Sequence, residues 1–354
     1  MGPRCLQVCV VSDIHHFIEE LWFTKPGEVA VRQADITQPH PGQVLVANHC
    51  SAVSAGTELL LYRGQIPQQM ALDASIASLQ EQSTYPLRYG YASVGRIVGL
   101  GEGVDKNWLN RRVFAFQPHG SHFLATPEQL IAIPDDVEDE DAVFLANMET
   151  AVNLVQDGAP LLGERVAVLG FGVVGLLLAS ILRQFPLQQL VGADALPLRR
   201  DLAMQTGVTF VADPNSAADV AKLRAQLNNG ADLIYEVTGA PAALNLAIDL
   251  SGFASRIVIG SWYGEKSAPI FLGGDAHRNR LKIITSQVST LAPELSGRWD
   301  KARRFTVAWE MLRQVQPSQW ISHRAPLAQA PELYRQLDHN PQNHLQVLFR
   351  YSHS

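Results

Sequence analysis

The sequence predicts an α/β protein with two domains, one mainly β and one built on a doubly wound parallel sheet. The chain has 354 residues, and because single cores stop growing at roughly 250–300 residues, a second domain is expected. Residues 21–120 hold short β-rich runs separated by proline and glycine, as in an irregular β domain. From residue 163 to about residue 291, apolar strands alternate with helical stretches, which predicts right-handed βαβ units and a parallel sheet.

The expected elements follow this division along the chain. In the first domain we expect strands at residues 43–47, 95–99 and 112–116. Residues 70–80 show helix-like spacing of apolar residues without glycine or proline, which predicts a helical flap over a cleft. In the second domain we expect strands at residues 166–169, 190–192, 210–211, 231–237, 256–259 and 281–285. The tail is expected to form helices at 301–314 and 330–337 and a final strand at 344–350.

Composition favours a folded protein whose partner is a small molecule. Hydrophobic residues make up 47% of the chain and charged residues 18%, far from the composition of a disordered segment. The formal net charge of −6 gives no basic excess, so neither nucleic acid nor an anionic membrane is an expected partner. The apolar run 166–182 approaches the length of a membrane span, but its glycines divide it into a strand, a turn and a helix.

The three cysteines, Cys5, Cys9 and Cys50, favour a reducing environment. Their spacing matches neither a disulfide framework nor a four-cysteine zinc site. The first residues also lack the basic region, apolar stretch and cleavage site of a signal peptide. We therefore expect a cytoplasmic protein.

A glycine-rich motif starts the second domain. Gly170, Gly172 and Gly175 form a G-x-G-x-x-G between an apolar strand and an apolar helix. In a dinucleotide-binding turn the first glycine permits the tight turn, the second lets the backbone approach the pyrophosphate, and the third lets helix and strand pack closely. Val173 and Val174 lie at the helix N-terminus, which then faces the phosphates. The alternative is a turn that packs helix on strand and binds no ligand.

Asp194 strengthens the dinucleotide prediction. It ends the next strand, about 20 residues beyond the glycines, where a carboxylate accepts hydrogen bonds from the adenosine ribose. An acid at this position repels a 2′-phosphate, so NAD(H) is favoured; NADP(H) is the alternative, because Arg199 and Arg200 lie close in sequence. Two more strand ends face the same crevice, and there Thr238 and Gly260 are expected to approach the nicotinamide half.

Four further segments match one known family in order. They are residues 41–47, similar to its first-domain strand, residues 54–59, similar to its catalytic Cys-Gly-Thr-Asp segment, residues 89–92, similar to its Gly-His-Glu segment, and residues 161–172, similar to the start of its dinucleotide-binding domain. On these residues the chain resembles the medium-chain dehydrogenase/reductase family, the zinc alcohol dehydrogenase superfamily, from about Leu21. We therefore expect a GroES-like, mainly β catalytic domain at residues 19–152 and 315–354, a Rossmann domain at residues 153–314, and an N-terminal extension at residues 1–18.

The zinc ligands of that family are missing from this sequence. Its zinc enzymes hold the metal with Cys, His and Cys or Glu, and here Ala55, Tyr91 and Ala146 stand at those positions. These side chains do not supply the N, S and O ligands that zinc needs. His119 and His122 have a spacing that a metal accepts, but their segment resembles the family's return strand into the cleft, so hydrogen-bonded histidines are expected. The resemblance and the missing ligands together imply chemistry without zinc or any other metal.

Four residues are candidates for the chemistry. Without zinc, preorganised hydroxyl or amide donors must stabilise charge on the reacting oxygen. Thr57 matches the family hydroxyl that passes a proton to or from the substrate, and Tyr91 is a second candidate donor. Asn147 and Glu149 are further candidates. For each of the four, the alternative is a hydrogen-bonded structural residue of the cleft wall.

Three functions fit these observations. Residues 51–58 and 85–91 resemble a zinc-less branch of the family that includes bacteriochlorophyllide hydroxyethyl dehydrogenase, and this implies a zinc-independent NAD(H) oxidoreductase of a secondary alcohol or ketone. A reductase of enones or quinones that uses NAD(P)H is the rival enzyme. The third function is a dinucleotide-binding protein that senses the redox ratio without catalysis. A homodimer is expected, because residues 281–286 form an apolar edge strand.

Overall fold

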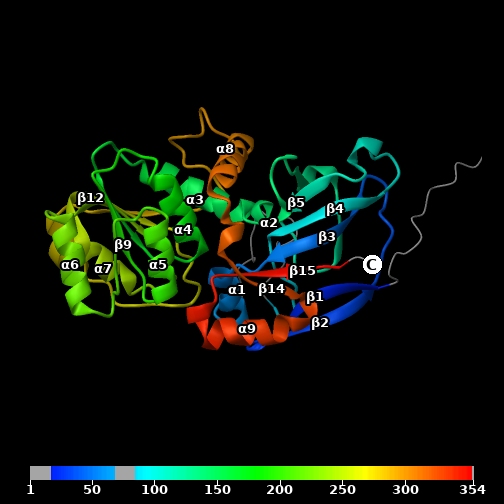
Figure 1. Cartoon of the computed structure of the whole chain (residues 1–354), viewed down its shortest axis with the longest axis horizontal. Coiled ribbons are helices and arrows are strands. Elements are labelled where there is room, and N and C mark those ends of the chain that lie inside the picture. The colour runs from blue at the N-terminus through cyan, green and yellow to red at the C-terminus, as the bar shows by residue number, and fades with distance from the viewer. Residues whose placement is uncertain (1–16, 68–83, 353–354) are drawn as a thin grey trace, which may run out of the picture.

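The structure is a computed structural model that describes residues 17–67 and 84–352. Two domains lie side by side, with a parallel sheet at the left of Figure 1 and a mainly antiparallel sheet at the right. Helices α3 (Leu145–Gly158) and α8 (Lys301–Val315) lie between them, at the top of the same view. The expected helical flap at 70–80, and residues 1–16 of the expected N-terminal extension, lie outside the described residues.

The first domain is built on a seven-stranded sheet of order β14-β15-β3-β4-β5-β7, with β6 paired to β3. Its strands are β3 (Val44–Ala52), β4 (Ser93–Leu100), β5 (Arg112–Ala115), β6 (His122–Ala125), β7 (Leu130–Ala132), β14 (Ile321–Pro326) and β15 (Gln346–Arg350). A separate antiparallel hairpin is formed by β1 (Phe17–Lys25) and β2 (Glu28–Asp35). Phe17 and Ile18, which the sequence places in an extension, are therefore the first residues of a strand.

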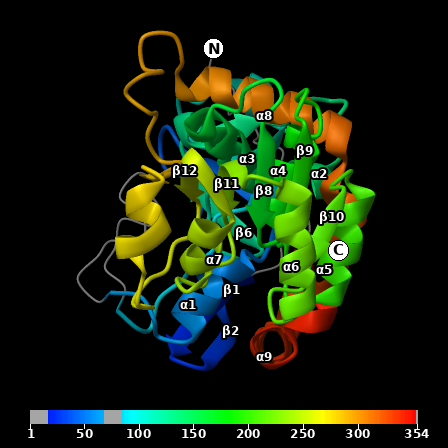
Figure 2. The same ribbon diagram turned by 90° about the vertical axis from the view of Figure 1, so that its left-hand side faces the viewer.

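The helices of the first domain are α1 (Ala55–Tyr62), α2 (Asp139–Ala142) and α9 (Ala330–His339). Figure 2 shows α1, α9 and the β1–β2 hairpin gathered at one end of the molecule. Their apolar faces share one core, in which Phe23, Leu61 and Tyr334 are buried. This packing fixes α1, the helix that carries the predicted catalytic Thr57.

The second domain is a six-stranded parallel sheet of order β10-β9-β8-β11-β12-β13. This is the doubly wound order in which the chain starts at the centre, moves to one edge and then returns to fill the other half. The strands are β8 (Arg165–Leu169), β9 (Gln189–Ala193), β10 (Phe210–Ala212), β11 (Ala231–Glu236), β12 (Ser251–Ile259) and β13 (Lys282–Thr285). The helices between them are α4 (Val173–Leu182), α5 (Pro197–Gln205), α6 (Ala217–Leu227) and α7 (Ala243–Leu250).

The central strand β8 explains why this half of the sequence shows continuous apolar runs. Val166 and Val168 are buried in the core that includes α3 and α4, while Ala167 and Leu169 are buried in the core that includes α6 and α7. A parallel strand covered on both faces needs apolar side chains at every position. Among the described residues, no helix has the length and apolar composition needed to cross a bilayer.

Candidate active site

A cleft of about 1550 Å³ lies between the two domains. One wall is formed by α1 and the residues before it, and the other by the carboxyl ends of strands in the parallel sheet, where ligands of such sheets bind. The structure brings all the predicted site residues to this cleft. They are Thr57, Tyr91, Asn147, Glu149, Gly170, Gly172, Val173, Val174, Gly175, Asp194, Arg199, Thr238 and Gly260.

The glycine-rich turn lies at the carboxyl end of β8, where α4 begins. Gly170 has a φ of +96°, and a Cβ on Gly175 would lie 2.0 Å from the carbonyl oxygen of Gly170, so both positions require glycine. A Cβ on Gly172 would meet nothing closer than Nη1 of Arg199 at 3.8 Å, so this backbone is open to the cleft. The first N–H groups of a helix have no partner inside it, so the start of α4 is available to an anion.

Asp194 directly follows β9 and is 7% exposed. Its Oδ2 accepts a hydrogen bond from the Phe171 N–H at 2.6 Å, and its Oδ1 accepts one from the Leu196 N–H at 2.8 Å. A carboxylate offers about four acceptor sites, so two remain for the hydroxyls of a ribose. Asp194 therefore both shapes the glycine-rich turn and lines the cleft.

Arg199 and Arg200 have different surroundings. Arg200 donates to the carbonyl of Asp194 at 2.8 Å and pairs with Asp213 at 3.5 Å. Arg199 lies beside Gly172, and its Nε is buried without a hydrogen-bond partner in the described part of the chain. Of the two arginines, Arg199 is the one available to a ligand in the cleft.

Glu236 organises the ends of β11 and β12. Its side chain is fully buried; Oε1 accepts the Thr238 N–H at 2.8 Å, and Oε2 accepts the Tyr263 hydroxyl. Burial and this hydrogen bond raise the pKa of Tyr263. A Cβ on Gly260 would lie 2.6 Å from Cδ2 of Leu154, so a larger residue there would make this buried side chain shift. Thr238 and Gly260 line the cleft, whereas the Tyr263 hydroxyl is bound to Glu236.

Polar side chains line the wall opposite the parallel sheet. Thr57 lies in the first turn of α1 and lines the cleft. Tyr91 donates to Oγ of Ser54, the residue directly before α1. Asn147, in the first turn of α3, is 7% exposed and lines the cleft as well. The structure therefore adds Ser54 to the donors that the sequence predicts.

Glu149 belongs to a buried ion cluster. Its Oε1 accepts hydrogen bonds from Nζ of Lys301 at 2.6 Å and from Nε of Arg304 at 3.0 Å. The fully buried Arg304 also donates to the carbonyl of Val288, in the loop 286–290 that lines the cleft. The cluster thus holds this loop against α3 and α8. This geometry favours the structural alternative for Glu149 over a role in proton transfer.

A buried hydrogen-bond network lies behind α1. Glu58 is fully buried, and its Oε2 accepts the Tyr334 hydroxyl and lies 3.1 Å from Nε2 of His119. Nδ1 of His119 lies 2.7 Å from Oγ of Ser51, so both ring nitrogens have a partner. Burial and the nearby Glu58 carboxylate raise the pKa of Tyr334. As the sequence predicts, His119 is a hydrogen-bonded histidine.

The residues present do not fit a tetrahedral zinc site. Ala55 and Ala146 offer no donor atom, and Tyr91 is bound to Ser54. Within residues 17–67 and 84–352, no three His, Cys, Asp or Glu side chains are grouped as metal ligands would be. Structural and catalytic zinc sites need at least three such ligands.

Three residues that line the cleft have little or no signal in the sequence. Ser54 has one signal, because it directly precedes the predicted catalytic segment. Arg63, which follows α1, and Lys266, in the loop after β12, also line the cleft. No local motif marks either cation, because tertiary structure alone brings their loops together.

Several known proteins that resemble this chain are dehydrogenases, the class of enzyme that the cleft indicates. Residues 173–307 match the family model of zinc-binding dehydrogenases. (R,R)-Butanediol dehydrogenase of Bacillus subtilis (strain 168) is 26% identical over 271 residues, which span 69% of this chain and 77% of that protein. An uncharacterized zinc-type alcohol dehydrogenase-like protein of Escherichia coli (strain K12) is 26% identical over 346 residues, which span 87% of this chain and 93% of that protein.

Solved structures share the whole fold. A short chain alcohol dehydrogenase from Escherichia coli CFT073, complexed with cofactor NADH, superposes with a TM-score of 0.77 at 19% identity, over 95% of this chain and 100% of that chain. The structure of 2R,3R-butanediol dehydrogenase from Bacillus subtilis gives the same TM-score, identity and coverage. These likenesses confirm the predicted fold of a catalytic domain joined to a Rossmann domain. The chain is thus similar to zinc-type alcohol dehydrogenase-like medium-chain dehydrogenases, and these similarities support an oxidoreductase enzyme.

Proposed function

We propose that this oxidoreductase transfers a hydride between NAD(H) and a secondary alcohol or ketone without zinc. One observation carries the proposal: a single cleft has Asp194 and the glycine-rich turn on one wall and the hydroxyls of Thr57 and Ser54 on the other. Relatives named as butanediol, guloside and threonine dehydrogenases support an alcohol as the substrate class. The resemblance to a zinc-less branch that includes bacteriochlorophyllide hydroxyethyl dehydrogenase agrees with the same chemistry.

The wall formed by the parallel sheet fits a nicotinamide dinucleotide. The backbone N–H groups of residues 172–174 would face the diphosphate, and Asp194 would accept the adenosine ribose hydroxyls. NAD(H) is favoured because the Asp194 carboxylate repels a 2′-phosphate and Arg200 is already paired. NADP(H) is the alternative, in which Arg199 would bind the 2′-phosphate. When bound, the nicotinamide ring supplies or accepts the hydride.

The opposite wall supplies donors to the reacting oxygen. The Thr57 hydroxyl donates a hydrogen bond to the oxygen of a ketone, and as it passes its proton to that oxygen it takes up one from water in the cleft. The same transfers run in reverse for an alcohol. Because Tyr91 donates to Oγ of Ser54, the hydroxyl hydrogen of Ser54 is left to point at the substrate. The Asn147 amide adds a further donor along the same cleft. Fixed donors of this kind stabilise the negative charge that develops on oxygen during hydride transfer.

Zinc independence is tested by metal analysis. Protein purified without chelator is expected to hold less than one zinc per chain, because Ala55, Tyr91 and Ala146 replace the metal ligands of the family. Dialysis against a chelator is then expected to leave turnover unchanged. One tightly bound zinc per chain, with loss of turnover when it is removed, would show that this part of the proposal is wrong.

The substrate class is tested by measuring NADH oxidation with panels of ketones, enones and quinones. We expect ketones to be reduced, and Thr57→Val to lower kcat by about a hundredfold, since a positioned proton donor contributes about 10²–10⁴. Thr306→Val is the matched control, because Thr306 is exposed on α8 and bonds a helix carbonyl. Turnover of enones or quinones alone would favour the rival reductase. Tight NADH binding without turnover of any panel would favour the non-catalytic sensor.

A further inference from the structure

Two cationic side chains, Arg63 and Lys266, line the cleft from opposite domains. Their loops are joined at the backbone: the Glu265 N–H donates to the carbonyl of Gln65 at 2.9 Å. A Cβ on Gly264 would lie 2.3 Å from the same carbonyl oxygen, so the two loops are in close contact. This contact between the two loops, one from each domain, brings Arg63 and Lys266 to the same part of the cleft.

Both cations keep donor groups that could bind an anion in the cleft. Arg63 uses Nε for a 2.5 Å ion pair with Asp338, and among the described residues no acceptor is bound by its terminal nitrogens. Lys266 donates to the uncharged carbonyl of Gly239 and forms no ion pair within the described residues. Burial, followed by the charge of Arg63, lowers the pKa of Lys266, and the buried carboxylate of Glu236 opposes this shift. Two like charges in one cleft repel each other unless an anion lies between them.

We propose that Arg63 and Lys266 together bind a carboxylate or phosphate group of the substrate, so that the enzyme acts on an anionic alcohol or ketone. This inference rests on the proposed function and narrows its substrate class. A guanidinium and an ammonium group both bind these anions through charge-assisted hydrogen bonds, and the guanidinium adds a paired geometry. The anion removes the repulsion between the two cations as it binds.

The position of the pair favours the substrate over the cofactor diphosphate as the source of the anion. The diphosphate has its own donors at residues 172–174, at the end of β8. Arg63 instead follows α1, the helix that carries Thr57, and a Cβ on Gly264 would lie 3.4 Å from Cδ1 of Leu60 in the same helix. A helix rises 1.5 Å per residue, so Thr57 and Arg63 are about 9 Å apart along α1. The anionic group therefore lies several bonds from the reacting carbon.

Binding without turnover provides the test. Isothermal titration of the NAD⁺-saturated protein would use methyl-ketone carboxylic acids of increasing chain length, starting at levulinate, each against its neutral methyl amide. Dihydroxyacetone phosphate against dihydroxyacetone forms the phosphate arm. We expect one charged series, the carboxylates or the phosphate, to bind at least tenfold more tightly than its neutral partners. Lys266→Met is expected to lower that preference by about ten- to a hundredfold, because it removes one charge-assisted hydrogen bond. Arg63→Gln is expected to act in the same direction.

Two control variants separate the explanations. Lys222→Met removes an exposed lysine that pairs with Asp219, and it is expected to change nothing. Asp338→Asn removes the ion pair of Arg63 without removing the cation, so it should keep the preference for the anion. Equal binding of charged and neutral probes by the wild type would overturn the proposal. So would a Lys266→Met variant whose affinity for NADH falls by as large a factor as its preference for the charged probes. A ketone that binds with the expected preference but is not reduced would contradict the proposed function and leave the anion site in place.

Discussion

The backbone N–H of Phe171 donates a hydrogen bond to Oδ2 of Asp194 at 2.6 Å, so the acid that follows β9 holds the centre of the glycine-rich turn. Phe171 lies between the two glycines that open this turn, Gly170 and Gly172. The carboxylate that is expected to bind the ribose therefore also shapes the backbone that is expected to bind the diphosphate. A substitution of Asp194 acts on both contacts at once.

Asp194→Ser is expected to lose NADH affinity and to gain NADPH affinity relative to NADH. The change removes both the acceptor and the like charge, and Arg199 can then pair with a 2′-phosphate. A charge-assisted hydrogen bond contributes about 1.5–3 kcal/mol, which corresponds to about ten- to a hundredfold in relative affinity. Fluorescence titration with both cofactors measures this ratio. A wild type that already prefers NADPH would show that Arg199 governs the pocket.

Asp194→Asn is the matched variant that separates the two roles of Asp194. Its amide keeps one acceptor oxygen and the shape of the side chain, but it carries no charge. We expect it to shift the preference toward NADPH while it keeps more NADH affinity than Asp194→Ser. Equal NADH affinity of the two variants would show that the bond to the Phe171 N–H contributes little to the turn.

Glu149→Gln is expected to destabilise the protein. Arg304 is fully buried, and removing the Glu149 charge leaves this guanidinium without a full counter-charge. Loss of one partner of a buried ion pair costs about 3–5 kcal/mol. Glu332→Gln, which breaks the exposed pair with Arg335, is expected to change the free energy of unfolding little, because solvent screens exposed ion pairs. Urea unfolding measures both, and similar midpoints for the two variants would contradict the structural role of Glu149.

The wall of the cleft formed by the parallel sheet could be predicted from the sequence, because the motif that marks it is local. Gly170, Gly172, Gly175 and Asp194 belong to one strand–helix–strand unit, so their spacing along the chain sets their positions in space. The apolar runs of the second domain likewise predict its strands, because both faces of the sheet are covered. Each expected strand of that domain occurs in the structure with bounds that differ at its ends.

The opposite wall, which carries Thr57, could be predicted only in part, because its contacts join segments that are distant in the sequence. Glu149 lies beside Asn147 and has the chemistry of a proton acceptor, yet its carboxylate is bound by Arg304, 155 residues further along the chain. Lys266 and Arg63 approach each other only through the packing of two domains. Spacing along the chain does not predict contacts between such distant residues. Thr57 can be predicted because it lies in a segment that resembles the catalytic segment of a known family.

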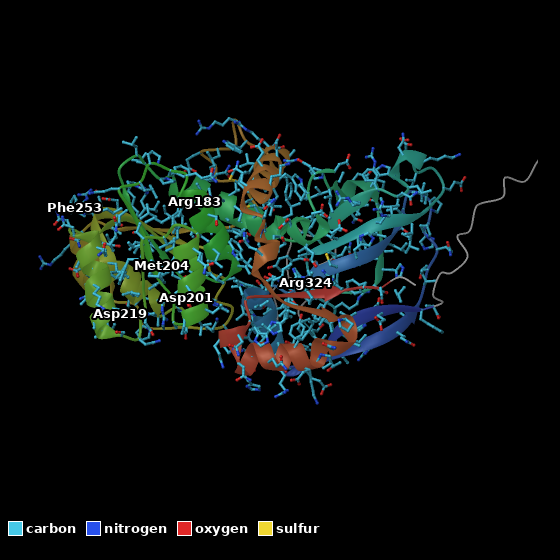
Figure 3. All side chains as sticks on the ribbon, in the orientation of Figure 1. Arg183, Asp201, Met204, Asp219, Phe253 and Arg324 are labelled. Carbon is cyan, nitrogen blue, oxygen red and sulfur yellow. The ribbon has the colours of Figure 1, made fainter. Side chains whose placement is uncertain are left out.

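The edge strand β13 leads us to predict a homodimer. Ile283 on this strand is 42% exposed, and Phe253, on the neighbouring β12, is 71% exposed at the outer end of the domain (Figure 3). An exposed edge with apolar side chains is a template for pairing with another strand. We expect light scattering to give the mass of a dimer and Ile283→Lys to shift it toward the monomer. Val98→Lys, at a 43% exposed position in the other domain, is the matched control, and a wild-type monomer at micromolar concentration would contradict the prediction.

Asp157 is expected to make stability fall as the pH rises. The pKa of Asp157 is raised, mainly by burial and also by the charge of Glu294. Hydrogen bonds from Ser286 and Asn153 and the charge of Arg304 lower this pKa, but by less. A carboxyl whose pKa is higher in the folded than in the unfolded state favours folding in its protonated form. Its contribution is therefore present at low pH and is lost as the pH rises through the raised pKa.

Asp157→Asn removes this titration and tests its sign. The amide oxygen still accepts a hydrogen bond from the Ser286 hydroxyl, so the variant gains stability over the wild type at about pH 7, and this gain shrinks toward about pH 3, below the usual range of aspartate. Asp136→Asn is the control of opposite sign, because the hydrogen bond from Arg313 lowers the pKa of Asp136 and its contribution is lost as the pH falls. Urea unfolding of both variants across this range gives the differences in free energy. A gain in Asp157→Asn that stays constant or grows toward low pH would show that the Asp157 carboxylate is stabilised by its hydrogen bonds more than it is destabilised by burial.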